Sequence, residues 1–413
     1  MNTLMNTLTA STHTAPQPPR HTPAAATTVM RLLQGLRHGS LTLHLPDGGV
    51  HTFGDGHGPC VSMHLHNWNA FGAALRSGDI GFAESYIAGD WTTPHLAQLL
   101  GLFTANRRAL EDVIHGSWAG RLLYRLRHLL HRNTRRNSRK NIHAHYDLGN
   151  AFYALWLDPT MNYSAALFEG EGRPHQDMQQ AQHAKVHRAL RMAGVRSGDR
   201  VLEIGCGWGA LAETATRELG AHLTGVTLST EQLAWAQQRL ATLGVADQAD
   251  LRLQDYRDIN DGPYDAICSI EMLEAVGREY WPTYFSNVSR LLKPGGRACI
   301  QSIVIQDHLF DRYIGSTDFI QQYIFPGGCL PSPTHVRRAA QTAGLQVVDE
   351  LAFGAGYAET CRRWRASFVA QREQVLALGF DERFLRIWEF YLAYCEAGFE
   401  AGDIDVVQYT LSK

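Results

Sequence analysis

The sequence lacks the features that mark several classes of protein. No apolar run approaches the roughly 20 residues that a membrane-spanning helix requires. The seven cysteines are scattered and never spaced as CxxC, which argues against a disulfide framework or a structural zinc site and suits a reducing cytoplasm. No histidine pair is joined to a carboxylate pattern, so we expect no catalytic metal. Because the first residues also lack the charged and apolar regions of a signal peptide, we expect a cytoplasmic protein.

The chain also lacks a large net charge. Its 38 Lys and Arg against 40 Asp and Glu give a net charge of -2, which argues against a strongly basic nucleic-acid binder. The distribution is uneven: residues 1–140 carry 14 basic against 7 acidic side chains, and the remainder carries 24 against 33. No acidic residue lies between Asp112 and Asp147, where arginines and a lysine cluster from Arg121 to Lys140. This asymmetry predicts an anionic partner for the N-terminal part.

The first 140 residues divide into a tail and a small domain. Residues 1–29 are rich in Thr, Ala and Pro and predict a disordered tail. Short apolar stretches then alternate with Gly-Asp turns, so we assign residues 30–140 to a mixed α/β domain that associates with lipid or membrane. Within it, residues 117–132 have the period of a basic amphipathic helix. That helix is equally compatible with lying on an anionic membrane and with packing in the protein behind a solvated arginine face.

Residues 141–413 alternate between strand and helix patterns, which is typical of a parallel α/β sheet. The predicted strands are 200–204, 222–228, 251–253, 264–270, 297–305, 345–353 and 405–411. Helical stretches separate them, as at 230–243 and 280–292. The pattern predicts a doubly wound, seven-stranded, Rossmann-like α/β domain that follows the smaller N-terminal domain.

The segment 201–209 (VLEIGCGWG) is an apolar strand that runs into a glycine-rich turn and a helix. Glycine lets the backbone approach a ligand closely, and a helix N-terminus offers free N–H groups. The turn does not continue to the GxGxxG of dinucleotide sites, and the next strand ends in GVTLS without an acid. Glu203 is placed either to order the loop or to receive a cationic ligand group, and Asp255 to accept from an adenine amine. S-adenosylmethionine is therefore the favoured cofactor, with NAD as the alternative.

These motifs belong to a longer series. In chain order the series is 145–150 (HYDLGN), 157–159 (LDP), 163–164 (YS), 201–209, 225–229 (GVTLS), 254–258 (QDYRD), 272–277 (MLEAVG), 292–296 (LKPGG), 323–328 (YIFPGG), 353–357 (FGAGY) and 394–399 (YCEAGF). It resembles the cyclopropane-fatty-acyl-phospholipid synthase family, which includes the mycolic-acid cyclopropane synthases. By position, the resemblance implies a cofactor site formed by Tyr163, Ser164, Glu203, Gly205, Cys206, Gly207, Trp208, Gly209, Thr227, Leu228, Ser229, Gln232, Gln254, Asp255 and Tyr256.

The resemblance also implies a reaction and a substrate. Members use S-adenosylmethionine to modify cis double bonds of lipid acyl chains, so the default product is a cyclopropane chain in a membrane phospholipid. This implies peripheral association with an anionic membrane surface and no nucleic-acid partner, and it is compatible with a homodimer. The alternatives are a methyl- or methylene-branched acyl chain from the same site, a methyltransferase for soluble small molecules, and a lipid-binding protein without catalysis.

Methyl transfer to a double bond leaves a carbocation, so the enzyme must exclude water and remove a proton before a ring can close. In the family a bound bicarbonate is the base, and the positions that hold it correspond here to Ala165, Glu274, Gln301, Ile303 and Tyr357. Ala165 and Gln301 stand where the family has Cys and His. Because glutamine cannot become cationic, proton loss to a branched chain is the alternative to bicarbonate-assisted ring closure.

Two further residues are candidates for the site. Cys395 matches the C-terminal cysteine of the family pattern, although the mechanism requires no covalent nucleophile and a buried structural thiol is the favoured role. Glu271 lies one helical turn before Glu274 and outside the motif, and we treat it as a contact for the ribose or the sulfonium.

Overall fold

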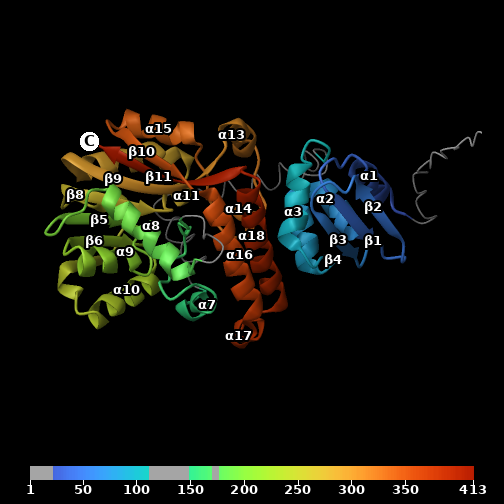
Figure 1. The fold of residues 1–413 in the computed structure, drawn as a ribbon, viewed down its shortest axis with the longest axis horizontal. Helices are drawn as coiled ribbons and strands as arrows, with labels where there is room; N and C mark the ends of the chain where they lie inside the picture. Colours follow the sequence, from blue (N-terminus) through green and yellow to red (C-terminus); the bar gives the residue numbers. More distant parts are fainter. Residues whose placement is uncertain (1–21, 111–147, 170–175) are drawn as a thin grey trace, which may run out of the picture.

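A computed structural model describes residues 22–110, 148–169 and 176–413. The structure contains two sheets, and Figure 1 shows the helices α16 Gly354–Ala370 and α18 Glu382–Glu400 between them. We name residues 22–110 the N-terminal lobe and the described residues from 148 onward the C-terminal lobe. The predicted helix at 117–132, the basic cluster from Arg121 to Lys140 and the first residues of the HYDLGN motif lie outside the described residues.

The N-terminal lobe consists of a four-stranded sheet and three helices. The elements are α1 Ala24–Leu33, β1 Ser40–His44, β2 Val50–Gly54, β3 Cys60–Leu65, α2 Asn69–Ala88, β4 Trp91–Thr92 and α3 Leu96–Ala105. The strand order is β2-β1-β3-β4, in which β1 and β3 run parallel and the other pairs run antiparallel. Mixed pairing of this kind agrees with the expectation of a small mixed α/β unit.

The prediction of a disordered tail over residues 1–29 is wrong at the C-terminal end of that range, because residues 24–29 belong to α1. Ala26, Val29, Met30 and Leu33 recur at helical spacing and are buried. The alanine- and threonine-rich composition concealed this stripe, and burial of its apolar side chains compensates for the weak helix propensity of the threonines.

The C-terminal lobe contains the seven-stranded sheet that the sequence predicted. Its strands are β5 Arg200–Ile204, β6 His222–Thr227, β7 Ala249–Leu253, β8 Tyr264–Ile270, β9 Leu292–Ile305, β10 Gln346–Ala352 and β11 Ile404–Ser412. Their order is β10-β11-β9-β8-β5-β6-β7. All seven strand predictions are confirmed, but β11 runs antiparallel to both of its neighbours, which the alternating pattern did not indicate.

Helices cover both faces of this sheet, so the doubly wound, Rossmann-like fold is confirmed. The helices of the C-terminal lobe are α7 Asn150–Ala154, α8 Met178–Met192, α9 Ala210–Glu213, α10 Thr230–Thr242, α11 Leu273–Val276, α12 Trp281–Leu291, α13 Asp307–Ile314, α14 Phe319–Tyr323, α15 Pro333–Thr342, α16 Gly354–Ala370, α17 Arg372–Ala377 and α18 Glu382–Glu400. Apolar side chains of α12 and α15 pack on one face, and those of α8, α9 and α10 pack on the other. Among the described residues, no helix is both long and apolar enough to cross a membrane.

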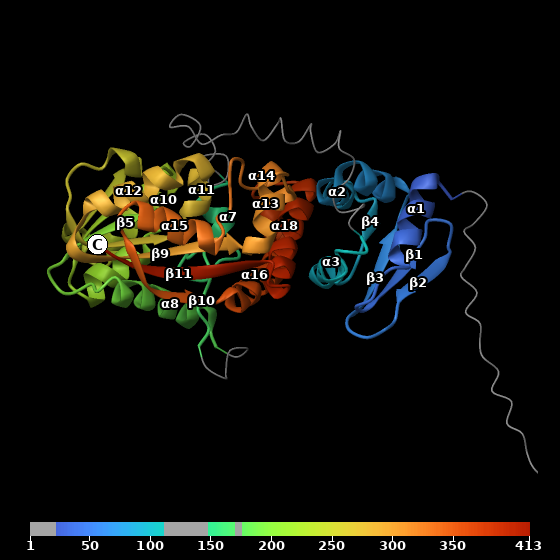
Figure 2. The same cartoon turned by 90° about the horizontal axis from the view of Figure 1, so that it is seen from above.

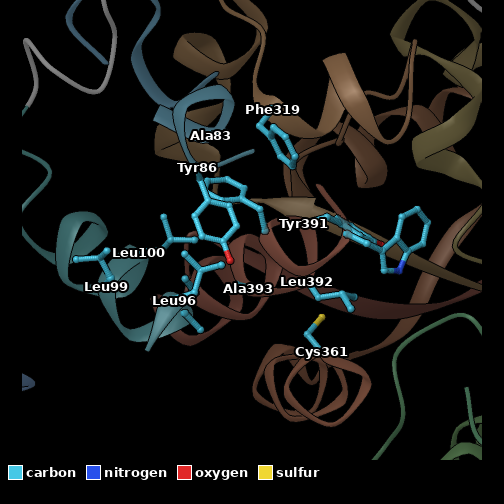
Figure 3. Close-up of a cluster of buried hydrophobic side chains, with 14 of the residues drawn as sticks. Ala83, Tyr86, Leu96, Leu99, Leu100, Phe319, Cys361, Tyr391, Leu392 and Ala393 are labelled. Carbon is cyan, nitrogen blue, oxygen red and sulfur yellow. The ribbon is translucent and has the colours of Figure 1, made fainter. Parts of the chain in front are cut away.

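Helix α18 joins the two lobes through a continuous apolar core. It packs against α16 on one side and against α2 and α3 on the other. Figure 3 shows Tyr86, Leu96, Leu99 and Leu100 of the N-terminal lobe with Tyr391, Leu392 and Ala393 of α18. The Tyr86 hydroxyl also donates a hydrogen bond of 2.9 Å to Glu389. Desolvated contacts of this kind hold the lobes in one arrangement, as expected for a large apolar domain interface.

Candidate active site

The glycine-rich turn after β5 forms one wall of a cavity of about 110 Å³. Gly205 has φ +86°, and a Cβ there would lie 2.3 Å from Cγ of Met272, so only glycine fits. Gly207 has φ +49°, and a Cβ there would meet no atom of the described residues within 4 Å. The turn therefore presents bare backbone to an open space, as a close ligand contact requires.

Most of the predicted cofactor residues line this cavity. They are Tyr163, Ser164, Glu203, Gly205, Cys206, Gly207, Trp208, Thr227, Leu228, Gln232, Gln254 and Tyr256. These residues come from the ends of β5, β6 and β7, from the first turn of α10 and from the segment after α7. The carboxyl ends of parallel strands are where ligands bind in open α/β sheets, so the sheet order itself gathers them.

Three predicted cofactor residues have other contacts in the structure. A Cβ on Gly209 would lie 2.9 Å from Cβ of Ala236, so this glycine allows close packing of α10. The Ser229 hydroxyl accepts a hydrogen bond from N of Gln232 and caps α10. Asp255 forms an ion pair of 2.5 Å with Arg257 and accepts from its backbone N–H. None of the three is among the residues that line the cavity.

Glu203 supplies the charge of the cofactor site. Its Oε2 is buried and has no hydrogen-bond partner among the described residues. Burial raises the pKa of Glu203 to about 8, while Lys185 and Arg239 oppose the rise. A cationic group on a ligand would pair with this oxygen and favour the ionised carboxylate. The orphaned acid and the bare glycine turn fit the ammonium and adenosyl parts of S-adenosylmethionine.

Sequence reasoning missed Lys185, which lies buried in α8 between the acids of the site. Its Nζ donates to Oγ of Ser164 at 2.5 Å and to Oδ1 of Asn162 at 3.1 Å. Burial lowers the pKa of Lys185 to about 8, although Glu271 and Glu203 counteract the fall. A lone lysine on a predicted helix gives no indication of such a position, because its partners come from other segments.

Glu271 is the acid at the centre of the site. Its Oε1 accepts hydrogen bonds from N of Ala165 at 2.9 Å and from Nε2 of Gln301 at 2.8 Å. Its Oε2 accepts from the Tyr357 hydroxyl at 2.7 Å. Ala165, Gln301 and Tyr357 are three of the positions that the family resemblance assigns to bicarbonate. The carboxylate of Glu271 therefore stands where the resemblance places that ion.

Glu274 binds the backbone of Ile303, which is another of the positions that the family resemblance assigns to bicarbonate. Its Oε1 accepts a short hydrogen bond from N of Ile303, and its Oε2 is buried without a partner among the described residues. Burial and repulsion by Glu271 raise the pKa of Glu274 to about 8. Burial also raises the pKa of Glu271, although Ala165, Tyr357, Lys185 and Gln301 oppose the rise. The donors predicted to hold bicarbonate thus bind two protein carboxylates, so the residues present do not fit that ion.

A buried chain of side chains fixes which end of the Gln301 amide faces Glu271. Arg188 can only donate, and its NH1 lies 2.7 Å from Oε1 of Gln408. The Nε2 of Gln408 therefore points the other way and donates to Oε1 of Gln301 at 2.9 Å. Nε2 of Gln301 is left to donate to Glu271. Arg188 and Gln408 are thus positioning residues that the sequence analysis did not identify.

A second, larger cavity of about 480 Å³ adjoins the first. Tyr163, Glu271 and Met272 line both cavities, so the acid stands at their junction. Glu274, Ile303, Tyr357 and Cys395 also line the larger cavity, whose walls are mostly apolar. Burial raises the pKa of the Cys395 thiol, so it stays protonated, which disfavours it as a nucleophile. Volume and lining suit a long hydrocarbon ligand.

The described residues contain no group of three His, Cys, Asp or Glu side chains that could hold a metal ion. The junction places a carboxylate base beside a site for a cationic ligand and an apolar cavity.

Comparison with known proteins agrees with this geometry. The model of the mycolic acid cyclopropane synthetase family matches residues 133–409. The chain belongs to this family. Its members include S-adenosylmethionine-dependent lipid methyltransferases and cyclopropane synthases, so this chain is such an enzyme and uses that cofactor. The family expected from the motifs is therefore confirmed.

Relatives along most of the chain include tuberculostearic acid methyltransferase UfaA1 of Mycobacterium tuberculosis, at 40% identity over 94% of this chain and 91% of that protein. Cyclopropane-fatty-acyl-phospholipid synthase of Escherichia coli is 34% identical over 86% of this chain and 88% of its own length. Among solved structures, mycolic acid cyclopropane synthase CmaA1 complexed with SAH and CTAB matches with a TM-score of 0.62 and 33% identity. The matched region covers 67% of this chain and 98% of the CmaA1 chain.

Proposed function

We propose that the protein methylates the cis double bond of a phospholipid acyl chain and that Glu271 is the base. The observation that carries this proposal is the position of the Glu271 carboxylate at the junction of the two cavities, held by Ala165, Gln301 and Tyr357. S-adenosylmethionine, when bound, supplies an electrophilic methyl group. The apolar cavity holds the acyl chain away from water, so the resulting carbocation survives until a proton leaves.

The role of Glu271 follows from its charge and surroundings. A carboxylate beside the carbocation stabilises it electrostatically and then accepts a proton from the transferred methyl group. Burial raises the pKa of Glu271, which strengthens it as a base, while hydrogen bonds from its three donors oppose the rise and favour the ionised form. The proton passes from carbon to the carboxylate, and the electrons of that C–H bond remain with the lipid.

We propose a branched acyl chain as the product, with a cyclopropane as the second candidate. If the C–H electrons bond to the neighbouring cationic carbon, a ring closes. If a 1,2-hydride shift first moves the cation to the methyl-bearing carbon, the same proton loss gives an exocyclic methylene group, with no net oxidation or reduction. The relative named for tuberculostearic acid, a branched fatty acid, supports the branched product.

Membrane association and the lipid headgroup belong to this proposal as well. The basic residues from Arg121 to Lys140 support attraction to an anionic membrane surface, where each contributes about 1 kcal/mol at low salt. The relative from Escherichia coli is named for a phospholipid substrate. Sedimentation with anionic vesicles over a salt series tests the attraction, and light scattering on the purified chain tests the expected homodimer.

The deciding experiment uses purified protein, S-adenosylmethionine carrying a ¹³C methyl group and vesicles of dioleoyl phospholipid. NMR of the extracted lipid separates an exocyclic methylene from a cyclopropane carbon, and mass spectrometry counts the added carbon. A labelled methylene signal supports the branched product, and a labelled ring signal establishes the second candidate. Label recovered only in soluble small molecules would contradict the acyl substrate itself.

A further inference from the structure

The larger cavity does not end in the C-terminal lobe. From Glu271 and Tyr357 it continues across the junction between the lobes into the core of the N-terminal lobe. There it is lined by Leu41 and Leu43 of β1, Met63 of β3, Phe71 of α2, and Val29 and Leu33 of α1. All six are at least nine-tenths buried and carry alkyl, thioether or aromatic side chains. We name this part of the cavity the N-terminal compartment.

Polar groups mark the place where the lobes meet. Asp79 of α2 accepts a hydrogen bond of 3.1 Å from the Tyr394 hydroxyl of α18, and Arg107 forms an ion pair with Asp403. All four residues line the same cavity. Figure 2 shows α2 and α3 beside α14 and α18 at this junction. The cavity therefore has one apolar part at the catalytic acid, a polar junction, and a second apolar part in the N-terminal lobe.

We propose that the N-terminal compartment binds hydrocarbon of the lipid substrate, an inference that rests on the acyl substrate proposed above. Its lining offers no partner to a phosphate or carboxylate, which would lose its hydration there without compensation. Methylene groups, in contrast, gain free energy by leaving water for such a surface. The cavity is continuous with the acid that faces the double bond, so the hydrocarbon belongs to the same lipid molecule.

Family members differ in whether they have this lobe. The matched structure of CmaA1 covers almost all of its own length but only 67% of this chain. The relatives UfaA1 and the synthase of Escherichia coli extend over 94% and 86% of it. The N-terminal compartment is therefore an addition to the shared catalytic lobe. It receives either the far end of the reacting chain or the second acyl chain of the same lipid, and both present the same chemistry.

A matched pair of variants in β3 tests the proposal. Met63 lines the compartment, whereas Leu65, two residues along the same buried face, does not. Met63→Trp should raise KM for dioleoyl phospholipid at least tenfold, while S-adenosylmethionine binding stays within twofold of the wild type. Leu65→Trp controls for strain in the lobe and should leave KM near the wild-type value once its folded fraction is matched by circular dichroism.

A comparison of two substrates distinguishes the two possible sources of the hydrocarbon, which are the far end of the reacting chain and the second acyl chain. If the KM effect persists with a single-chain oleoyl lysophospholipid, the compartment holds the end of the reacting chain. If it appears only with the two-chain lipid, the compartment holds the second chain. Equal effects of Met63→Trp and Leu65→Trp on both substrates would overturn the proposal.

Photolabelling gives a measurement that needs neither turnover nor a variant. Wild-type protein with S-adenosylhomocysteine is mixed with phospholipid whose acyl chains carry a terminal diazirine, irradiated, and digested for mass spectrometry. Labels on residues 29–71 support the compartment, and labels confined to residues 148–413 overturn it. Because this binding readout is independent of methyl transfer, a failure of the proposed reaction is distinguishable from a failure of the compartment.

Discussion

At the scale of single residues, Glu271 combines three properties that single out a functional group. It has φ +54°, a conformation that costs a residue other than glycine about 1–3 kcal/mol and that clusters at active sites. Its N–H donates to O of Gln301 at 2.8 Å, which helps to hold the strained backbone. Its carboxylate receives three hydrogen bonds while lining two cavities. Packing alone does not explain so costly an arrangement.

Replacing this acid should therefore reduce turnover without unfolding the site. Glu271→Gln keeps the shape but removes the base: its amide oxygen can accept from Ala165 and Gln301, and its NH2 can donate to the Tyr357 hydroxyl. We expect the rate of methyl transfer to fall by about 10²-fold or more, the usual scale for loss of an acid–base group. Calorimetry should show S-adenosylmethionine affinity within a few-fold of the wild type. Glu274→Gln is the matched comparison, and a larger loss there than at Glu271 would restore Glu274 as the central acid.

The hydrogen bonds from Gln408 to Gln301 and from Gln301 to Glu271 predict that a variant of Gln408 changes the pH dependence of the reaction rate. Gln408→Leu frees Gln301 to rotate, so the ionised form of Glu271 loses a donor and its pKa rises further. Because the carboxylate must be ionised to act, the acidic limb of the pH–rate profile should move to higher pH. Thr410→Val, on the same strand, removes a buried hydroxyl that takes no part in this hydrogen-bonded series of side chains. It should leave the acidic limb of the pH–rate profile in place. A lower rate with an unmoved limb would mean that Gln408 acts only through packing.

At the scale of elements, the sequence predicted most of what depends on local pattern. Runs such as VLEI at 201–204 predicted strands, and glycines placed the cofactor turn after β5. The sequence predicts only a ribose or sulfonium contact for Glu271, because its partners Ala165, Gln301 and Tyr357 come from three distant segments. No spacing in the chain shows that convergence. The antiparallel direction of β11 was missed for the same reason, since it is set by how α18 returns the chain to the sheet.

The turn after β5 allows a test of the cofactor site with a closely matched control. Gly207→Val points a branched side chain into the open space of the cavity, so S-adenosylhomocysteine binding should fall below detection in calorimetry. Gly244 also has a positive φ, +70°, and a Cβ there would meet no atom of the described residues within 4 Å, but this glycine lies outside the cavity lining. Gly244→Val imposes similar backbone strain and should bind as the wild type does. Equal weakening by both variants would mean that strain, and not filling of the cavity, is responsible.

At the scale of the whole molecule, the junction between the lobes encloses two acids. Gly78, with φ +62° and ψ -136°, interrupts α2 and is followed by Asp79, which faces Tyr394 and the start of α14. Asp318 caps α14 through N of Gln321 at 2.9 Å. Burial raises the pKa of Asp79 to about 7, with repulsion from Asp318 as the second cause, and burial raises that of Asp318 to about 6. The contact between lobes therefore favours protonated acids.

This arrangement predicts that the contribution of the junction to stability falls as pH rises. Between the ordinary pKa of an aspartate near 4 and about 7, the folded state holds a proton on Asp79 that the unfolded state has lost, so the free energy of unfolding decreases with pH. Above about pH 7 Asp79 is ionised in both states, so its effect on the free energy of unfolding no longer changes with pH. Asp79→Asn keeps an acceptor for Tyr394 without the charge, so it should melt several degrees above the wild type at pH 8 and approach it at pH 4 to 5. Asp47→Asn, in an exposed turn of the same lobe, is the control. Thermal melts from pH 4.5 to 8 measure the difference, and a melting temperature of Asp79→Asn below that of the wild type at pH 8 would show that the folded protein stabilises the ionised acid.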